Sequence, residues 1–448
     1  MKHVLRNLRR LVQDVANEVV VNVLSAAALG ALAFVLLGGR VDDVLLRLRG
    51  SAPVSGEVTL LGIDEEAFYL WNPYEPEPER TPRGMLAELV LFLHAAGARV
   101  VVIDVLTDQP ADGDEALVRA VQAHGRVVVA ERFSPGRADG ATPFAPASVL
   151  AEVAVPAYAN LGLEEPTLFS DNLLVRAVPL AMGVARSRLS GPFPNGLVGA
   201  FQDDGAPIPA LSLAAAWLQR SKDPPATLAR SLAGRCGGQP LECTAGTAAL
   251  GLPAAPGELH EALPINFRGP EGGDHIPSVS AARVLRSLAE VALARSLGLE
   301  LPLVVPDDVA ALLRDKVVVV GRVDAAAGDQ FVTPLSFPAL IHPDMSGPRV
   351  HAQVIDTLLS GRHLRRVSGL WAWVPAAALG LAVLLTGRRA GVGHVLAGLG
   401  VGAALVGAAA VCFQLFDGLV LDVAPALAVL FCSLLAVHVY ARSAESPG

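Results

Sequence analysis

The chain has 448 residues, a mean hydropathy of +0.47 and 17% charged residues, a combination typical of a protein that joins membrane-spanning segments to a water-soluble part. Its net charge is −8 and it has no basic stripe interleaved with aromatic residues, which argues against nucleic acid as a partner because phosphate binding needs clustered Lys and Arg. At this length, one large domain with several membrane segments is the natural division.

The first predicted element is an apolar segment, residues 19–38, which is long enough to cross the hydrocarbon core of a membrane. The apolar run continues past the small-residue triplets that mimic a signal-peptidase site, so we expect an uncleaved anchor. Residues 1–18 are expected in the cytoplasm because four basic side chains precede the anchor: Lys2, Arg6, Arg9 and Arg10.

A large water-soluble α/β domain is predicted over residues 41–366. Its predicted strands are short apolar runs rich in β-branched residues, namely Val58–Ile63, Arg99–Ile103, Arg126–Ala130 and Lys316–Val320. Helical stretches are predicted at Met85–Ala96 and Asp114–His124, and a glycine follows each of them. Strands that are apolar throughout and separated by helices predict a mostly parallel sheet with helices on both faces.

The ends of these strands are the predicted place for a ligand. In an open parallel sheet, ligands bind beyond the carboxyl ends of the strands. Asp64 and Asp104 each follow a predicted strand, and a later strand stops at Gly321. We therefore expect these two carboxylates and the loop after Gly321 to converge at one edge of the sheet.

Two of the four cysteines, Cys236 and Cys243, flank a turn-forming stretch within the large domain. We expect a disulfide between them, since an oxidising compartment favours it. A metal site is the alternative, but neither neighbouring segment supplies a His within the usual ligand spacing. For the chain as a whole, we predict no metal site and no cofactor. The other two cysteines, Cys412 and Cys432, lie inside hydrophobic segments.

Three more apolar segments follow the large domain and are predicted membrane helices: residues 370–386, 391–416 and 418–440. Arg388 and Arg389 mark the loop after the first of them as cytoplasmic, whereas Asp417 and Asp422 suit the outer face. Four crossings place both termini inside, and residues 441–448 are expected to form a short cytoplasmic tail.

Nine short sequence blocks follow one another in order within the large domain: Leu61–Glu65, Thr81–Arg83, Gly97–Asp104, Asn160–Gly162, Val175–Arg176, Ile265–Gly269, Ser280–Leu285, Gly328–Pro334 and Val350–Leu359. In this order they resemble the type-two CHASE family, extracellular sensory modules of bacterial cyclases, histidine kinases and Ser/Thr kinases. One predicted span before the domain and three after it are similar to this family's layout. The resemblance implies a sensory domain on the outer side of the bacterial inner (plasma) membrane. A cytoplasmic effector domain, which the family carries, is not expected in this chain.

The candidate ligand-binding residues are seven polar side chains: Asp64, Arg83, Asp104, Arg268, Asp329, Thr333 and His351. The three carboxylates follow strand-like runs, where they can bind a cation or a polar ligand, or instead cap the helix or loop that follows. The two arginines can hold an anionic ligand by paired donors, or instead form an ion pair with one of these aspartates. Thr333 precedes a proline, which suits an extended or turn geometry with the hydroxyl facing a pocket. His351 can report pH, or instead cap or pack the last helix of the domain.

No phosphate-binding loop, nucleophile elbow, zinc-protease helix or kinase motif occurs in the sequence, so no catalytic residue and no enzyme activity are predicted. The leading hypothesis is a membrane-anchored receptor that recognises an unknown small ligand or an exported protein and passes the stimulus to a separate signalling protein in the membrane or cytoplasm. Membrane lipid is the other expected partner. The first alternative is a non-sensing envelope scaffold or assembly subunit. The second is a metal-dependent hydrolase built on Asp64 and Asp104.

Overall fold

The structure is a computed structural model that describes these residues: 41–74, 80–131, 149–159, 161–164, 174–182, 208–225, 227–235, 245–255, 261–270, 275–297, 304–324, 328–336, 345–367, 378, 392–421, 423, 427, 430 and 432–436. The chain divides into two compact units. The larger unit is drawn from Gly50–Glu165 and Asn172–His363, and the smaller from Met1–Arg49, Pro166–Asp171 and Leu364–Gly448.

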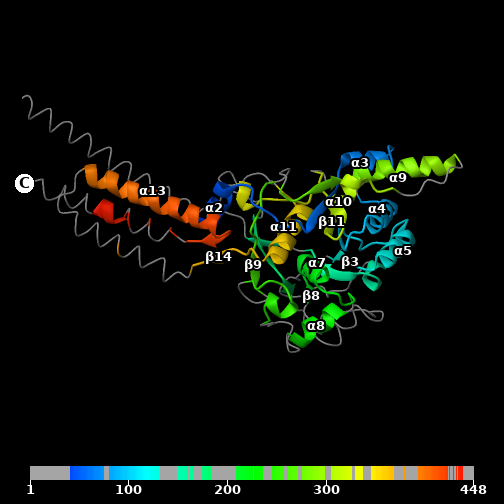
Figure 1. Cartoon of the computed structure of the whole chain (residues 1–448), viewed down its shortest axis with the longest axis horizontal. Coiled ribbons are helices and arrows are strands. Elements are labelled where there is room, and N and C mark those ends of the chain that lie inside the picture. The colour runs from blue at the N-terminus through cyan, green and yellow to red at the C-terminus, as the bar shows by residue number, and fades with distance from the viewer. Residues whose placement is uncertain are drawn as a thin grey trace, which may run out of the picture. The chain divides into compact units, whose positions relative to one another are not determined.

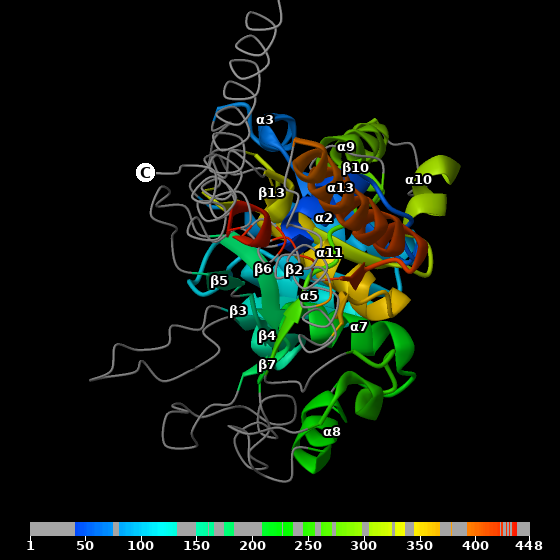
Figure 2. The same ribbon diagram turned by 90° about the vertical axis from the view of Figure 1, so that its left-hand side faces the viewer.

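A parallel sheet forms the centre of the larger unit. Its six strands lie in the order β10 (Ser278–Ser280), β1 (Val58–Ile63), β11 (Val317–Arg322), β2 (Val100–Asp104), β3 (Val127–Glu131) and β4 (Val155–Tyr158). Every neighbouring pair is parallel, and Figure 2 shows β2, β3 and β4 next to one another. The predicted mostly parallel sheet is therefore confirmed.

The order of the strands determines where a ligand can bind. The chain runs from β2 through β3 to β4 in one direction, whereas β1 and β10 lie on the opposite side of β11. The strand order thus reverses between β1 and β2, with β11 inserted between them. A crevice at the carboxyl ends of the strands is expected at such a reversal.

Helices cover both faces of the sheet (Figure 1). On one face lie α3 (Glu65–Trp71), α4 (Arg83–Ala95), α5 (Asp114–His124), α9 (Ala281–Ser296) and α10 (Asp307–Leu313), whose apolar side chains share one core with the sheet. On the other face, α11 (Gly347–Ser360) packs on β1 and β11, and α7 (Leu211–Arg220) packs on β2, β3 and β4. Because both faces are covered, the strands are apolar throughout rather than alternating.

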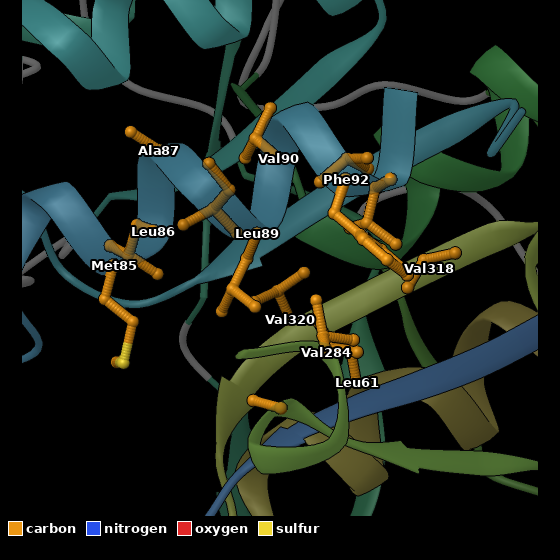
Figure 3. Packing of buried hydrophobic residues seen from close by; sticks show 14 of the residues in the cluster. Leu61, Met85, Leu86, Ala87, Leu89, Val90, Phe92, Val284, Val318 and Val320 are labelled. Carbon is orange, nitrogen blue, oxygen red and sulfur yellow. The ribbon is translucent and has the colours of Figure 1, made fainter. Parts of the chain in front are cut away.

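The core on the α4 face explains why these segments form their elements. Leu89 and Phe92 of α4 are fully buried and point towards Val320 and Val318 of β11, in one core with Leu61 of β1 (Figure 3). Full burial of each such side chain stabilises the fold by about 1.5–3 kcal/mol. The helices end where glycines adopt a left-handed conformation, as predicted: Gly97 follows α4 with φ 78° and Gly125 follows α5 with φ 75°.

Shorter elements complete the larger unit. Two small antiparallel sheets join β5 (Gly162–Glu164), β6 (Leu174–Pro179) and β9 (Ala262–Pro264), and β7 (Ala181–Met182) with β8 (Ile208–Pro209). A third antiparallel pair joins β12 (Gln330–Phe331) to β13 (Met345–Ser346). The remaining helical segments are α8 (Thr227–Arg235), η1 (Val149–Glu152), η3 (Thr247–Leu250) and η5 (Pro334–Ser336). Of these, the β12–β13 pair matters most for the site, because it holds the chain after β11 against the start of α11.

The smaller unit brings segments from both ends of the chain together. Helix α2 (Val41–Arg49) packs on α13 (Val392–Leu415), and β14 (Arg365–Arg366) pairs in parallel with β15 (Leu419–Val420). The Arg49 guanidinium lies 5.0 Å from the centroid of the Phe413 ring, and its Nη1 is 3.4 Å from Asp417 Oδ1. Arg366 forms a second ion pair, with Asp42 of α2. The residues just before and just after the larger unit are thus fastened to each other.

The membrane spans and the disulfide stay predictions. The segment 19–38 lies outside the described residues, 370–386 is described only at residue 378, and 391–416 contains α13. Among the described residues, no helix has both the length and the apolar character that a membrane crossing demands. Cys236 and Cys243 also lie outside the described residues, while Cys412 and Cys432 are free thiols.

Candidate functional site

A cavity of about 630 Å³ lies at the carboxyl edge of the sheet, where the strand order reverses. Its wall includes Arg83, Asp104, Ala159, Arg322, Asp329 and His351. Cavities of roughly 300–1,000 Å³ are the usual size for small-molecule sites. Four of the seven predicted site residues line it: Arg83, Asp104, Asp329 and His351. They come from the start of α4, the end of β2, the turn before β12 and helix α11.

Asp104 is the last residue of β2. Because side chains alternate along a strand and Val101 and Ile103 belong to the core on the α4 face, Asp104 points to the opposite face, where α11 begins. Its Oδ2 atom is buried and has no hydrogen-bond partner among the described residues. Burial raises the pKa of this carboxyl from 3.8 to about 7. Asp104 is therefore a half-buried acid that titrates near neutral pH.

Asp329 lies in the turn between β11 and β12, and the pairing of β12 with β13 fixes its position. The backbone N–H of Gly347 donates a hydrogen bond of 2.9 Å to its carbonyl oxygen. Burial is the main cause that raises the pKa of Asp329 to about 6, and the negative charge of Asp104 raises it further. Two neighbouring carboxyl groups that both resist ionisation are thus placed on one cavity.

His351 lies in the second turn of α11 and is 2% exposed. Its Nε2 is 3.2 Å from the carbonyl oxygen of Ala159, and burial lowers the pKa of the ring to about 4. Since a carbonyl can only accept, Nε2 carries the proton of the neutral ring, and Nδ1 is left as an acceptor. Nδ1 is buried and has no hydrogen-bond partner among the described residues.

The first turn of α11 reaches the site because Gly321 has no side chain. A Cβ at this position of β11 would lie 2.3 Å from Cγ of Pro348 and 3.2 Å from the carbonyl oxygen of Asp104. A Cβ contact as short as the one with Pro348 essentially never occurs, so glycine at this position permits the close approach of helix and strand. The sequence block Gly347–Pro348 starts the helix, with proline at a position where its missing N–H is tolerated.

Arg83 lines the cavity but is occupied by protein groups. Its Nε is 3.2 Å from Oδ1 of Asp114, and its two Nη atoms donate to the carbonyl oxygens of Leu106 and Gln109 at 3.4 and 3.3 Å. The side chain is 3% exposed, and burial lowers the pKa of the guanidinium. Arg83 therefore fastens the loop between β2 and α5 to the start of α4.

Arg322, at the end of β11, was not among the sequence-predicted site residues. Its guanidinium binds both carboxylate oxygens of Asp324, at 3.0 and 2.7 Å, and lies 4.8 Å from the centroid of the Phe68 ring. The available signal was its place directly after Gly321, at the end of a predicted strand. Nothing in the sequence marks Ala159, which contributes only its backbone carbonyl.

The other predicted site residues lie away from the cavity wall. Asp64 is the N-cap of α3, where its two oxygens accept from the Ala67 N–H at 2.9 Å and the Ser280 hydroxyl at 2.7 Å. Arg268 is buried, with Nε 3.5 Å from Oδ2 of Asp356 on α11, and Asp356 is not one of the strand-end aspartates. Thr333 is fully buried. Across the part of the chain that the structure describes, no three His, Cys, Asp or Glu side chains are grouped to hold a metal ion.

Comparison with known proteins places the chain in a family. The CHASE2 domain family matches residues 19–388, which is most of the chain and includes all residues of the cavity wall. No curated protein and no solved structure shows a significant match. CHASE2 is a family of extracellular sensory domains, the family that the ordered sequence blocks resemble. The chain therefore belongs to the CHASE2 domain family.

Proposed function

We propose that this protein is a membrane-anchored extracytoplasmic receptor, in which the cavity beside Asp104, Asp329 and His351 binds a small polar ligand. Family membership supports a sensory role outside the cytoplasm. The observation that carries the proposal is the cavity itself, which lies where an open α/β sheet binds its ligands and contains buried polar atoms without partners among the described residues.

The unsatisfied polar atoms favour a receptor over a scaffold. A buried acceptor without a partner costs about 1–3 kcal/mol. An envelope scaffold gains nothing from keeping such groups in a cavity, whereas a binding site keeps them for its ligand. Asp104 Oδ2 and His351 Nδ1 both carry this cost on the same cavity.

Helix α11 offers a route for the signal. It carries His351 in the cavity wall, is buried from Gly347 to Leu359, and ends at Ser360, shortly before the chain enters the smaller unit at Leu364. A ligand that binds two positions of α11 with different affinity shifts the population between them. We propose that the predicted spans 19–38, 370–386, 391–416 and 418–440 carry this shift to a partner outside these 448 residues.

A stability screen of the purified full chain tests this function. Small polar compounds are added one at a time, and the thermal unfolding midpoint is measured. We expect at least one compound to raise the midpoint by about 3–8 °C through mass action. His351→Phe fills the cavity and should abolish that rise. If no compound raises the midpoint, or if the rise survives in His351→Phe, the cavity is not the receptor site.

A second measurement tests the location. In intact cells stripped of the outer permeability barrier, added protease should cleave the domain 41–366 and leave cytoplasmic controls untouched. Protection of the domain until the inner membrane is lysed would contradict an extracytoplasmic receptor.

A further inference from the structure

The chemistry of the cavity wall specifies the class of ligand. Asp104 Oδ2 and His351 Nδ1 are buried acceptors without hydrogen-bond partners among the described residues. Asp329 lines the same cavity, and its carboxyl interacts electrostatically with Asp104 and with the His351 ring. These three groups come from the end of β2, the turn before β12 and helix α11. It is therefore the tertiary fold, and not any one helix or strand, that brings them to the same cavity.

Two of the donors in the wall are engaged by protein groups, whereas the buried Thr81 hydroxyl has no hydrogen-bond partner among the described residues and can accept from a ligand as well as donate to it. Arg83 donates to Asp114 and to the Leu106 and Gln109 carbonyl groups, while Arg322 holds both oxygens of Asp324. Two of the three arginines of the wall are thus paired with protein acceptors, and the third, Arg80, is exposed. The buried atoms of the wall without partners among the described residues are Asp104 Oδ2, His351 Nδ1 and Thr81 Oγ1. All three can accept a hydrogen bond, which suits a ligand that donates.

A protonated amine matches this arrangement in charge and in geometry. An ammonium group has three N–H donors and no acceptor, which suits a wall that offers two neighbouring carboxylates. Bare metal ions fit less well, since no group of three metal-ligating side chains is found in the described part of the chain and a volume of about 630 Å³ is far larger than one ion needs.

We propose that the cavity recognises a small organic molecule through a primary ammonium group, which donates to the neighbouring carboxylates of Asp104 and Asp329, while the neutral ring of His351 lies in the same wall. This inference rests on the proposed receptor function and names the ligand class of the same site. Binding of a cation also relieves the repulsion between the two carboxyl groups, because the ammonium takes the place of the proton that they otherwise retain. The neutral ring of His351 contributes an acceptor and no competing positive charge.

The test uses four linear molecules with the same carbon-chain length: putrescine, γ-aminobutyrate, butanediol and succinate. Each is added at pH 8 to the purified full chain, and the thermal unfolding midpoint and the dissociation constant are measured. We expect putrescine, γ-aminobutyrate or both to raise the midpoint by about 3–8 °C. Butanediol and succinate, which lack an ammonium group, should leave it unchanged.

Two isosteric variants assign the binding to the cavity. Asp104→Asn and Asp329→Asn each remove one charge with little change in shape and should raise the dissociation constant of the amine at least about tenfold. Asp308→Asn is the matched control, because Asp308 of α10 is exposed, pairs with Arg283 of α9 and does not line the cavity. The control should bind like the parent chain. Equal affinity in all three variants would overturn the assignment to this cavity.

The outcomes separate this inference from the proposed function. If butanediol or succinate stabilises the chain and His351→Phe abolishes that effect, the cavity is a receptor site but the ammonium inference is wrong. If none of the four compounds binds while another compound from the wider screen does so in a His351-dependent manner, the inference is also wrong and the receptor stands. If no compound binds in the cavity at all, both fail.

Discussion

The carboxylate of Asp329 lies directly against the α-carbon of Gly347, so closely that a Cβ at position 347 would be 2.1 Å from Oδ2. The same two residues share a backbone hydrogen bond, from the Gly347 N–H to the Asp329 carbonyl oxygen. The position of one acid of the cavity and the first residue of α11 are therefore set together. Any shift of the helix start must therefore move this carboxylate.

The first prediction concerns this contact. Gly347→Ala should destabilise the protein by about 2 kcal/mol or more, because the new methyl group overlaps the carboxylate and packed surroundings relax only partly. The free energy of unfolding in urea measures the effect. Gly234→Ala is the control, since Gly234 lies in α8 with nothing within 4 Å of a new Cβ, and there alanine should be neutral or stabilising. Equal stability of the two variants would contradict the contact.

The second prediction follows from the raised pKa of Asp104. In the folded chain this carboxyl titrates at about 7 instead of 3.8, so the folded state binds the proton more tightly than the unfolded state between these values. The free energy of unfolding therefore falls as pH rises from 3.8 to about 7. Above pH 7 the folded state carries the whole cost of holding an ionised, buried carboxylate. Asp104→Asn should be more stable than the parent chain by at least about 1 kcal/mol at pH 8 and equal to it near pH 4. Urea unfolding at both pH values checks the sign, and a gain of the same size at both would exclude a titration effect.

A third prediction concerns acid lability at the other end of the sheet. His124, at the end of α5, accepts from the Arg126 N–H at Nδ1 (3.3 Å) and lies 3.1 Å from the Ala98 carbonyl oxygen at Nε2. Burial is the main cause that lowers the pKa of His124 to about 4, and the nearby His94 lowers it further. Because the unfolded ring titrates at 6.5, the stability that the neutral ring provides is lost as pH falls from 6.5 towards 4.

His124→Asn should therefore flatten the stability profile of the chain over this pH range by roughly 1–3 kcal/mol. The free energy of unfolding at pH 7 and at pH 4.5 measures the change. His94→Asn is the comparison: it removes a positive neighbour, so the acid loss should become smaller but persist. A parent profile that is flat in this range would show that His124 titrates normally.

The fourth prediction separates a buried ion pair from an exposed one. Arg83→Met leaves Asp114 without its 3.2 Å partner and releases the loop after β2, so it should cost about 2–4 kcal/mol. Arg119→Met breaks only the exposed pair with Glu115 on α5 and should change stability by less than about 0.5 kcal/mol. Similar losses in both variants, measured by urea unfolding, would mean that the Arg83 contacts do not anchor the loop.

The central strands could be predicted from sequence because their residues are apolar on both faces. The runs at Val58–Ile63 and Lys316–Val320 match β1 and β11 closely, and the helical stretch Asp114–His124 matches α5. The edge strands β4 and β10 were not predicted: β4 includes Pro156, and β10 is only three residues long with two serines. Tertiary pairing with β3 and β1 makes strands of them, and no local pattern reports such pairing.

The candidate site could be predicted only in part, for a related reason. The rule that ligands bind at the carboxyl ends of strands identifies Asp104, but it gives Asp64 the same weight. What distinguishes them is a partner distant in sequence: Ser280 binds Asp64, whereas Asp104 Oδ2 has no partner among the described residues. Likewise, only the fold shows that Arg268 faces Asp356.

The position of β11 in the sheet has a consequence for how this domain folds. β11 lies between β1 and β2, yet it is the last strand of the sheet to be synthesised. Until Arg322 has been made, β1 and β2 each lack a neighbour and leave an open edge that is prone to mispairing. The centre of the sheet therefore closes only after nearly the whole domain has emerged, and fragments that stop before this strand should aggregate rather than fold.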